Sequence, residues 1–230
     1  MAEREAAEHP PAPAPARGSL SRDAVLRGAV DLADRIGVDA LTIRRLADHL
    51  GAKPMSIYHY VANKEDIIDG MVGLVFDEIT RPPVDLPWKA AIRVRAESAR
   101  DVLRRHPWAP PLMESRTAPN PSILGHHEAV LAVWFRAGFP LELIAHAGAV
   151  LDAYLYGFAL QEAALPFGER EGDLSDVADA LITPMSPDEY PHLVRFAGEY
   201  VMQPGYDFGH SFDFGLDLIL DGFEAALARS

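Results

Sequence analysis

Three consecutive aromatic residues, Tyr58, His59 and Tyr60, lie in a short polar segment, GAKPMSIYHYVANKEDIID, that spans residues 51–69. A helix directs neighbouring side chains to different faces, so it cannot bury all three. Hydroxyl and imidazole groups can hydrogen-bond to base edges or to phosphates, and apolar surface can contact a thymine methyl group. These residue types indicate contact with the major groove of DNA. The alternative is an exposed helical turn whose aromatic residues are incidental.

Two short helices, predicted at residues 42–50 and 53–60, would position these groups. Apolar residues recur with helical spacing in the first segment and stop at Gly51, a typical residue for the end of a helix. In the second segment, Ile57 and Val61 lie on one face and can anchor the helix to a core. Two helices at this spacing are typical of a helix-turn-helix unit, whose second helix enters the major groove.

The residues around the second helix are candidates for phosphate contacts. Thr42, a predicted N-cap, and Arg44 begin the supporting helix. Lys64 begins the helix that follows, where Asn63 is the predicted N-cap and Asp66 is expected to bond back to it. Free backbone N–H groups at that helix start also attract phosphate. The remaining candidates lie on the second helix itself. The predicted DNA-binding residues are Thr42, Arg44, Lys53, Met55, Ser56, Tyr58, His59 and Lys64.

Helical spacing continues along most of the remaining chain. No stretch shows the alternation typical of a β-strand and no internal repeat is found, so the predicted fold class is all-α. Residues 1–18 are rich in proline and alanine and are predicted to be a disordered tail. Further helices are predicted at residues 25–36, from 64 to before Pro82, and at 88–105, 121–137, 141–165, 186–201 and 211–228.

The charge distribution is uneven. The whole chain has a net charge of −13, which is unusual for a protein that binds nucleic acid. Residues 17–64, however, carry eight Lys or Arg against five Asp, whereas residues 65–230 carry 12 basic against 26 acidic residues. A mildly basic N-terminal module therefore precedes an acidic body, which weakly favours a DNA partner.

The composition limits the environment of the chain. Cysteine is absent, which excludes disulfides and thiolate zinc sites and fits a reducing cytoplasm. No uninterrupted apolar run reaches the roughly 18–20 residues that cross a bilayer, and the N-terminus lacks a signal-peptide pattern. We expect a cytoplasmic protein with no membrane partner.

The segment over residues 20–70 resembles the DNA-binding region of the TetR (tetracycline repressor) family. The C-terminal part also resembles the tetracycline-repressor branch, because AGFPLELIAHAG and FDFGLDLILDGFEAAL are similar to its long dimerisation helices. The motifs that carry the N-terminal resemblance are Leu41-Thr42, Leu46-Ala47, Leu50-Gly51, Tyr58, Val61 and Asn63-Lys64-Glu65.

This resemblance implies an all-helical homodimer with a DNA-binding domain at residues 19–66 and a larger ligand-binding and dimerisation domain at 67–230. A small molecule bound in the larger domain would change the separation of the two DNA-binding heads and release a palindromic operator. The dimer is expected to form through the helices at about 140–165 and 208–228. The apolar last helix is also compatible with a central helix buried inside one monomer.

The ligand pocket is expected among large residues of the middle helices, since pockets are mainly apolar and aromatic with a few polar groups. Each of these residues is equally compatible with an ordinary core. An aromatic or hydrophobic effector is the default hypothesis. The predicted ligand-binding residues are Trp108, Met113, His127, Trp134, Tyr154, Phe158 and Gln161.

No metal or cofactor is expected. Tetracycline-binding members of the family hold magnesium through a histidine on the short sixth helix, and residues 107–125 contain no histidine. Met113 and Glu114 lie there instead, which argues against a tetracycline–magnesium complex. Glu142 and His146 have the wrong spacing for a helical carboxylate–histidine metal site.

No motif singles out a catalytic site. Neither a glycine-rich phosphate loop nor a Gly-x-Ser-x-Gly nucleophile motif is present. We therefore expect a ligand-responsive transcriptional regulator that represses as a homodimer. The alternative is a helical small-molecule binding or catalytic protein with a vestigial DNA-binding head.

Overall fold

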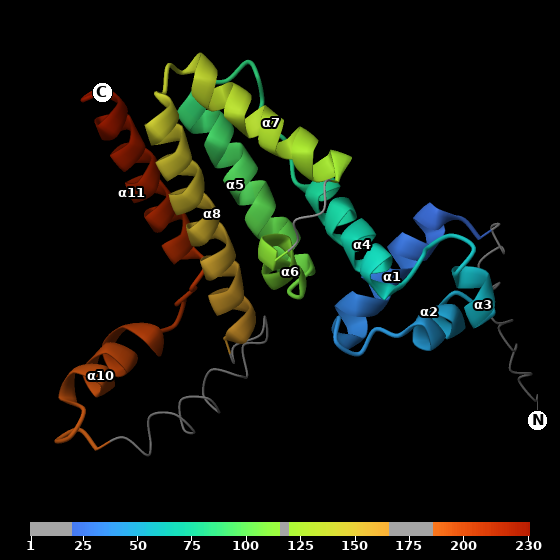
Figure 1. Cartoon of the computed structure of the whole chain (residues 1–230). Helices are drawn as coiled ribbons and strands as arrows, with labels where there is room; N and C mark the ends of the chain where they lie inside the picture. The colour runs from blue at the N-terminus through green and yellow to red at the C-terminus, as the bar shows by residue number, and fades with distance from the viewer. Residues whose placement is uncertain (1–19, 116–119, 166–185) are drawn as a thin grey trace, which may run out of the picture.

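The computed structural model describes residues 20–115, 120–165 and 186–230. Within these ranges the chain is helical and contains no strand, which confirms the all-α prediction. The tail predicted at 1–18 and most of the connection before residue 186 lie outside the described residues. Figure 1 shows a small group of helices at the N-terminal end, joined through α4 to a larger group that ends in α11.

The N-terminal group comprises α1 (Arg22–Ile36), α2 (Ile43–His49), α3 (Pro54–Ile57) and the start of α4 (Lys64–Glu78). The apolar stripe of α1 packs against α4 and α2 because its helical spacing places those side chains on one face. The two predicted anchors of α3, Ile57 and Val61, are buried in this core. Gly51 has a φ of 62°, a left-handed conformation that glycine adopts without strain and that turns the chain from α2 towards α3.

The start of α4 is fixed by polar contacts from three segments. Asn63 is its N-cap, as predicted, and accepts a hydrogen bond from the Asp66 backbone N–H at 2.9 Å. Asp66 was expected to return a bond to the cap residue, but its carboxylate accepts from the backbone N–H of Ala62 at 2.8 Å. The same carboxylate pairs with Arg22 of α1 at 2.6 Å, and both contacts hold the pKa of Asp66 below its usual value. These contacts fix the turn after α3 against α1.

The larger group comprises α5 (Trp88–Arg105), α6 (Ala109–Ser115), α7 (Pro121–Arg136), α8 (Leu141–Ala164), α10 (Pro191–Phe196), a π-helical turn at Ala197–Val201 and α11 (His210–Leu227). The sequence did not predict α6 because Pro110 and Pro111 resemble helix breakers. Both lie in the first turn of α6, where proline is tolerated since no intrahelical N–H bond is lost.

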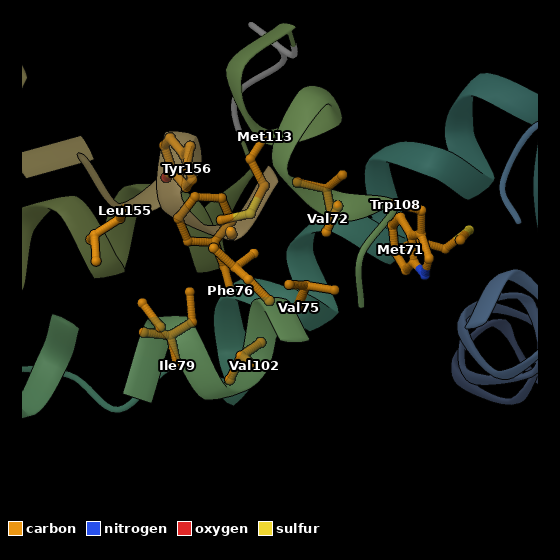
Figure 2. Close-up of a cluster of buried hydrophobic side chains, with 14 of the residues drawn as sticks. Met71, Val72, Val75, Phe76, Ile79, Val102, Trp108, Met113, Leu155 and Tyr156 are labelled. Carbon is orange, nitrogen blue, oxygen red and sulfur yellow. The ribbon is translucent and has the colours of Figure 1, made fainter. Parts of the chain in front are cut away.

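Helix α4 connects the two groups. It packs against α1 in the first group and against α6 and α7 in the second. Figure 2 shows its buried side chains, among them Phe76, which points towards Met113 of α6 and Tyr156 of α8. A single continuous helix therefore connects the two groups.

Helix α8 is the longest described helix and has apolar residues on most of its surface. Its buried side chains pack against α5, α6 and α11. By length and composition it is a candidate membrane span, which inspection for uninterrupted apolar runs missed because His146 and Asp152 interrupt it. The buried core helix of a globular protein can meet the same criteria of length and composition. The packing of α8 against other helices accounts for part of its apolar surface.

The outer face of the pair formed by α8 and α11 remains uncovered in the single chain. The two helices lie side by side at one edge of the molecule, far from α2 and α3 (Figure 1). The exposed apolar residues on this face are Val150 and Leu160 of α8 and Phe214 and Leu218 of α11. Large apolar side chains exposed on neighbouring helices are typical of a protein–protein interface.

Candidate nucleic-acid interface and ligand pocket

The surface formed by α2, α3 and the turn after α3 carries the predicted DNA-binding residues. Helix α3 is shorter than predicted and ends at Ile57, and residues 58–60 form a turn. The turn keeps Tyr58 and His59 exposed, while Tyr60 packs partly against the core. The backbone carbonyl of Tyr60 accepts a hydrogen bond from Arg22 at 3.0 Å, which holds the turn in place.

The predicted groove contacts protrude from this surface. Met55 is 73% exposed and Tyr58 is 48% exposed, although large apolar side chains of this kind are usually buried in a folded protein. Ser56 is half-buried, and Lys53, the N-cap residue of α3, is exposed. Thr42 caps α2 by accepting a hydrogen bond from the Arg45 backbone N–H at 3.2 Å. That bond leaves the Thr42 hydroxyl proton available to a phosphate.

The charges of the N-terminal group are divided between two surfaces. On α1, Arg27 pairs with Asp23 at 2.9 Å and Arg35 pairs with Asp31 at 3.0 Å, so this face is internally neutralised. Around α2 and α3, no ion pair involves the remaining cations in the part of the chain that the structure describes. These cations are Arg44, Arg45, Lys53 and Lys64. An unneutralised positive surface beside an exposed helix is the arrangement that binds phosphates.

The larger group contains a cavity of about 120 Å³ between α5, α7 and α8. Two predicted ligand-binding residues, His127 and Trp134, line it. The rest of its wall is made by apolar residues and by two charged residues, Arg95 and Asp152, that the sequence reading did not select. The cavity therefore combines an aromatic wall with a pair of opposite charges.

The other predicted ligand-binding residues lie elsewhere. Trp108 is buried where α6 meets α1, and Met113 packs near Phe76 (Figure 2). Tyr154 stacks on Phe212 of α11 and donates a hydrogen bond to its carbonyl at 2.8 Å.

Two predicted residues remain at the C-terminal half of α8. Phe158 stacks on Phe208 with ring centroids 4.8 Å apart, and Gln161 is exposed. Tyr154 and Phe158 thus pack α8 against the segment that leads into α11. Whether any of the seven contacts an effector stays a prediction.

A buried polar cluster links the cavity to α7. The Arg95 side chain donates from Nε to Nε2 of His126 at 3.2 Å and from Nη2 to Oδ1 of Asp152 at 3.2 Å. Burial, reinforced by the charge of Arg95, lowers the pKa of His126 to about 3, so the ring is neutral. The sequence contained one signal for this cluster, since Arg95 lies on the apolar stripe of α5 with Ile92 and Ala99.

A second polar cluster ties α1 to the junction of α5 and α6. Asp34 of α1 accepts a hydrogen bond from Nε1 of Trp108 at 2.6 Å and lies 2.8 Å from Nδ1 of His106. His106 is also 3.3 Å from the carboxylate of Glu78, which pairs with Arg105 at 2.6 Å. Burial opposes ionisation of Glu78, but the hydrogen bonds from Arg105 and His106 outweigh it and lower its pKa. The N-terminal group is therefore attached to the larger group at this cluster as well as through α4.

Comparison with known proteins assigns both parts of the chain. Residues 25–71 match the family described as "Bacterial regulatory proteins, tetR family", and residues 82–227 match "Tetracyclin repressor-like, C-terminal domain". The second match covers more than half of the chain. The chain belongs to the TetR family. The predicted family and its helix-turn-helix head are confirmed, and this TetR-family chain is a ligand-responsive transcriptional regulator.

Curated relatives share most of the chain. The HTH-type transcriptional repressor DrrR1 of Streptomyces coeruleorubidus is 32% identical over 94% of this chain and 82% of its own length. The tetracycline repressor protein class A from transposon 1721 of Escherichia coli is 28% identical over 88% of this chain and 90% of its own. The similarity thus extends over both the head and the larger group.

Solved structures agree with the TetR-family fold. A possible TetR family transcriptional regulator from Streptomyces coelicolor A3(2) superposes with a TM-score of 0.73 at 27% identity, over 90% of this chain and 100% of that one. ActR of Streptomyces coelicolor in complex with actinorhodin gives a TM-score of 0.73 at 24% identity, over 91% of this chain and 97% of that one. At the latter identity the likeness supports the fold alone.

Proposed function

We propose that this TetR-family regulator is a cytoplasmic repressor that binds a palindromic operator as a homodimer and is released by a small aromatic molecule. The observation that carries the proposal is the exposed α3 segment surrounded by cations that have no ion-pair partner among the described residues. A catalytic role for the chain is not proposed, since its family consists of transcriptional regulators. The vestigial-head alternative is not favoured because the head matches the DNA-binding family over residues 25–71.

The roles of the head residues follow from their positions. Lys53, Met55, Ser56, Tyr58 and His59 enter the major groove with α3 and the turn after it. Thr42, Arg44 and Lys64 hold phosphates on both sides of the groove and set the register of the helix. The acidic body repels DNA, so that only the head approaches the duplex.

We assign these functions to two domains. We assign DNA binding to residues 19–66 and ligand binding with dimerisation to residues 67–230. The boundary falls within α4, whose continuity from the head to α7 supports mechanical coupling between the domains. The outer faces of α8 and α11 form the dimer interface, because their exposed apolar residues would be covered by the same faces of a second chain.

The effector is expected to occupy the space between α5, α7 and α8. Binding there releases the operator only if the effector binds one separation of the two heads better than the other. The heads must fit half-sites about 34–36 Å apart, or a multiple of that spacing, so a shift of a few ångströms misplaces one recognition helix.

Salt dependence of DNA binding tests the proposed function. Neutralising several phosphates per dimer releases counterions, so operator affinity is expected to fall by roughly 10³-fold or more between 50 and 200 mM salt. Fluorescence anisotropy on a duplex recovered from a random pool would measure the slope. An affinity that does not change with salt would contradict phosphate contact by the head. A scrambled duplex of equal length controls for non-specific attraction.

A further inference from the structure

The 120 Å³ cavity between α5, α7 and α8 is slightly smaller than a cavity of about 150 Å³ that binds benzene, so it has room for about one aromatic ring. Figure 1 shows α5 between α7 and α8 in the larger group. The wall of the cavity has an apolar part and a polar part. The residues that decide its chemistry are Trp134, Ile144 and Leu151 on the apolar side and Arg95, His127 and Asp152 on the polar side.

Arg95, which lines this cavity, retains a hydrogen-bond donor without a partner among the described residues. Its side chain is 3% exposed, and two of its three nitrogens donate to His126 and Asp152. The third nitrogen, Nη1, makes no hydrogen bond within the described ranges. In the described part of the chain, Nδ1 of His126 is the only fully enclosed side-chain nitrogen or oxygen that lacks a partner. Nη1 of Arg95 also lacks a partner, so it is not fully enclosed. Nη1 therefore keeps accessible surface, and Arg95 lines the cavity.

The wall of the cavity carries one cation and one carboxylate. The cation of Arg95 faces the carboxylate of Asp152, whose side chain is partly exposed. His126 adds no charge, because its Nε2 accepts from Arg95 and the ring is neutral. His127 is exposed and also lines the cavity. A ligand atom at Nη1 thus finds a hydrogen-bond donor whose charge is offset by Asp152, and a second carboxylate would be repelled by Asp152.

We propose that the cavity receives an aromatic ring of the effector whose uncharged carbonyl oxygen accepts a hydrogen bond from Nη1 of Arg95. This inference rests on the proposed function, because it names the chemistry of the effector at the same pocket. The apolar wall with Trp134 contacts the ring, and Arg95 selects for the oxygen. Buried polar groups left unpaired give strong discrimination against a ligand that lacks the matching group.

The same arginine connects the cavity to the head. Arg95 holds His126, and the ring of His126 packs edge-on against Phe76 of α4 with centroids 5.6 Å apart. A ligand oxygen bound to Arg95 is therefore linked to α4 through two contacts, Arg95 to His126 and His126 to Phe76. Helix α4 continues into the head.

The test uses the full-length dimer without DNA and three one-ring probes that differ only in their polar group. These are acetophenone, benzoate and ethylbenzene, measured by ligand-observed NMR titration. Acetophenone is expected to bind about tenfold more tightly than ethylbenzene, as one hydrogen bond to a charged donor provides, and more tightly than benzoate. Arg95→Met should abolish the preference for acetophenone over ethylbenzene. Equal binding of acetophenone and ethylbenzene to the unmodified protein, including no binding of either, would overturn the proposal.

A second variant keeps the test decisive if Arg95→Met does not fold. Asp152→Asn retains the shape and the acceptor oxygen but leaves the charge of Arg95 unbalanced. Benzoate affinity should then rise about tenfold while acetophenone changes by less than about threefold. The matched control is Glu142→Gln, the same charge change on α8 at a side chain that is 89% exposed, and it should leave both affinities unchanged. Unchanged benzoate affinity in Asp152→Asn would contradict the proposed balance of charges.

Operator affinity of the parent and of the Glu142→Gln control separates this inference from the proposed function. Glu142→Gln alters neither the head nor the cavity, so its operator affinity without probe should stay within about threefold of the parent. If the probe preferences hold but no operator is bound by the parent, the proposed function fails and the ligand chemistry stands. If operator binding holds but the preferences are absent, the ligand chemistry fails.

Discussion

Leu218→Asp is expected to convert the dimer into monomers and to abolish high-affinity operator binding. Leu218 is 59% exposed on α11, one turn from Phe214, which is 69% exposed. The inner face of α11 is formed by buried apolar residues, and the exposed Asp217 and Asp221 pair with Arg93 and Lys89 of α5, so the face with Phe214 and Leu218 is the one free to pair. The substitution occurs twice in a symmetric interface and places two carboxylates in an apolar contact. The dimer should weaken by roughly a thousandfold or more.

Sedimentation velocity at micromolar concentration would measure this change directly. Val84→Asp is the matched control, because Val84 is also exposed, at 74%, but lies on the loop between α4 and α5. That control should remain dimeric. A Leu218→Asp protein that stays dimeric would place the interface elsewhere and return α11 to the role of an internal helix.

Tyr58→Ala combined with Lys64→Ala is expected to lower operator affinity by about a hundredfold while leaving the fold intact. Tyr58 protrudes from the turn after α3, and Lys64 begins α4 without an ion-pair partner in the described residues. Each change removes a contact in both half-sites. Tyr58 is exposed, and Lys64 is half-buried without an ion pair in the described residues, so the free energy of unfolding should change by less than about 1 kcal/mol.

Anisotropy titrations and urea unfolding of the same preparations would separate the two effects. Phe135→Ala with Arg136→Ala is the matched control, since it removes an exposed aromatic residue and a cation from the end of α7, far from the head. The control should bind operator as the parent does. Operator binding that survives the Tyr58 and Lys64 changes would show that a different surface reads the DNA.

Local signals in the sequence were sufficient for most helices. The helix predicted at residues 88–105 is found as α5 with the same bounds, because Pro87 precedes it and Pro107 follows it. The N-caps at Thr42 and Asn63 were also correctly predicted, since each depends on residues within one turn. Family recognition relied on equally local motifs in the head.

Features that depend on distant residues could not be predicted in this way. The end of α3 at Ile57 is stabilised by Arg22, which lies in α1 and bonds the carbonyl of Tyr60. The cavity pairs Arg95 with Asp152, 57 positions apart, and Trp108 meets Asp34 across 74 positions. Periodicity marks these side chains as facing inward but does not identify their partners, so the contact of Trp108 with α1 could not be predicted.

Selection of bound duplexes from a random DNA pool, with the full-length protein at physiological salt, tests the central claim most directly. A twofold dimer that reads DNA through α3 should enrich an inverted repeat. The centres of its half-sites should lie about one helical turn apart, or a multiple of that. Failure of a folded dimer to enrich any sequence, or enrichment of a single asymmetric site, would contradict the account.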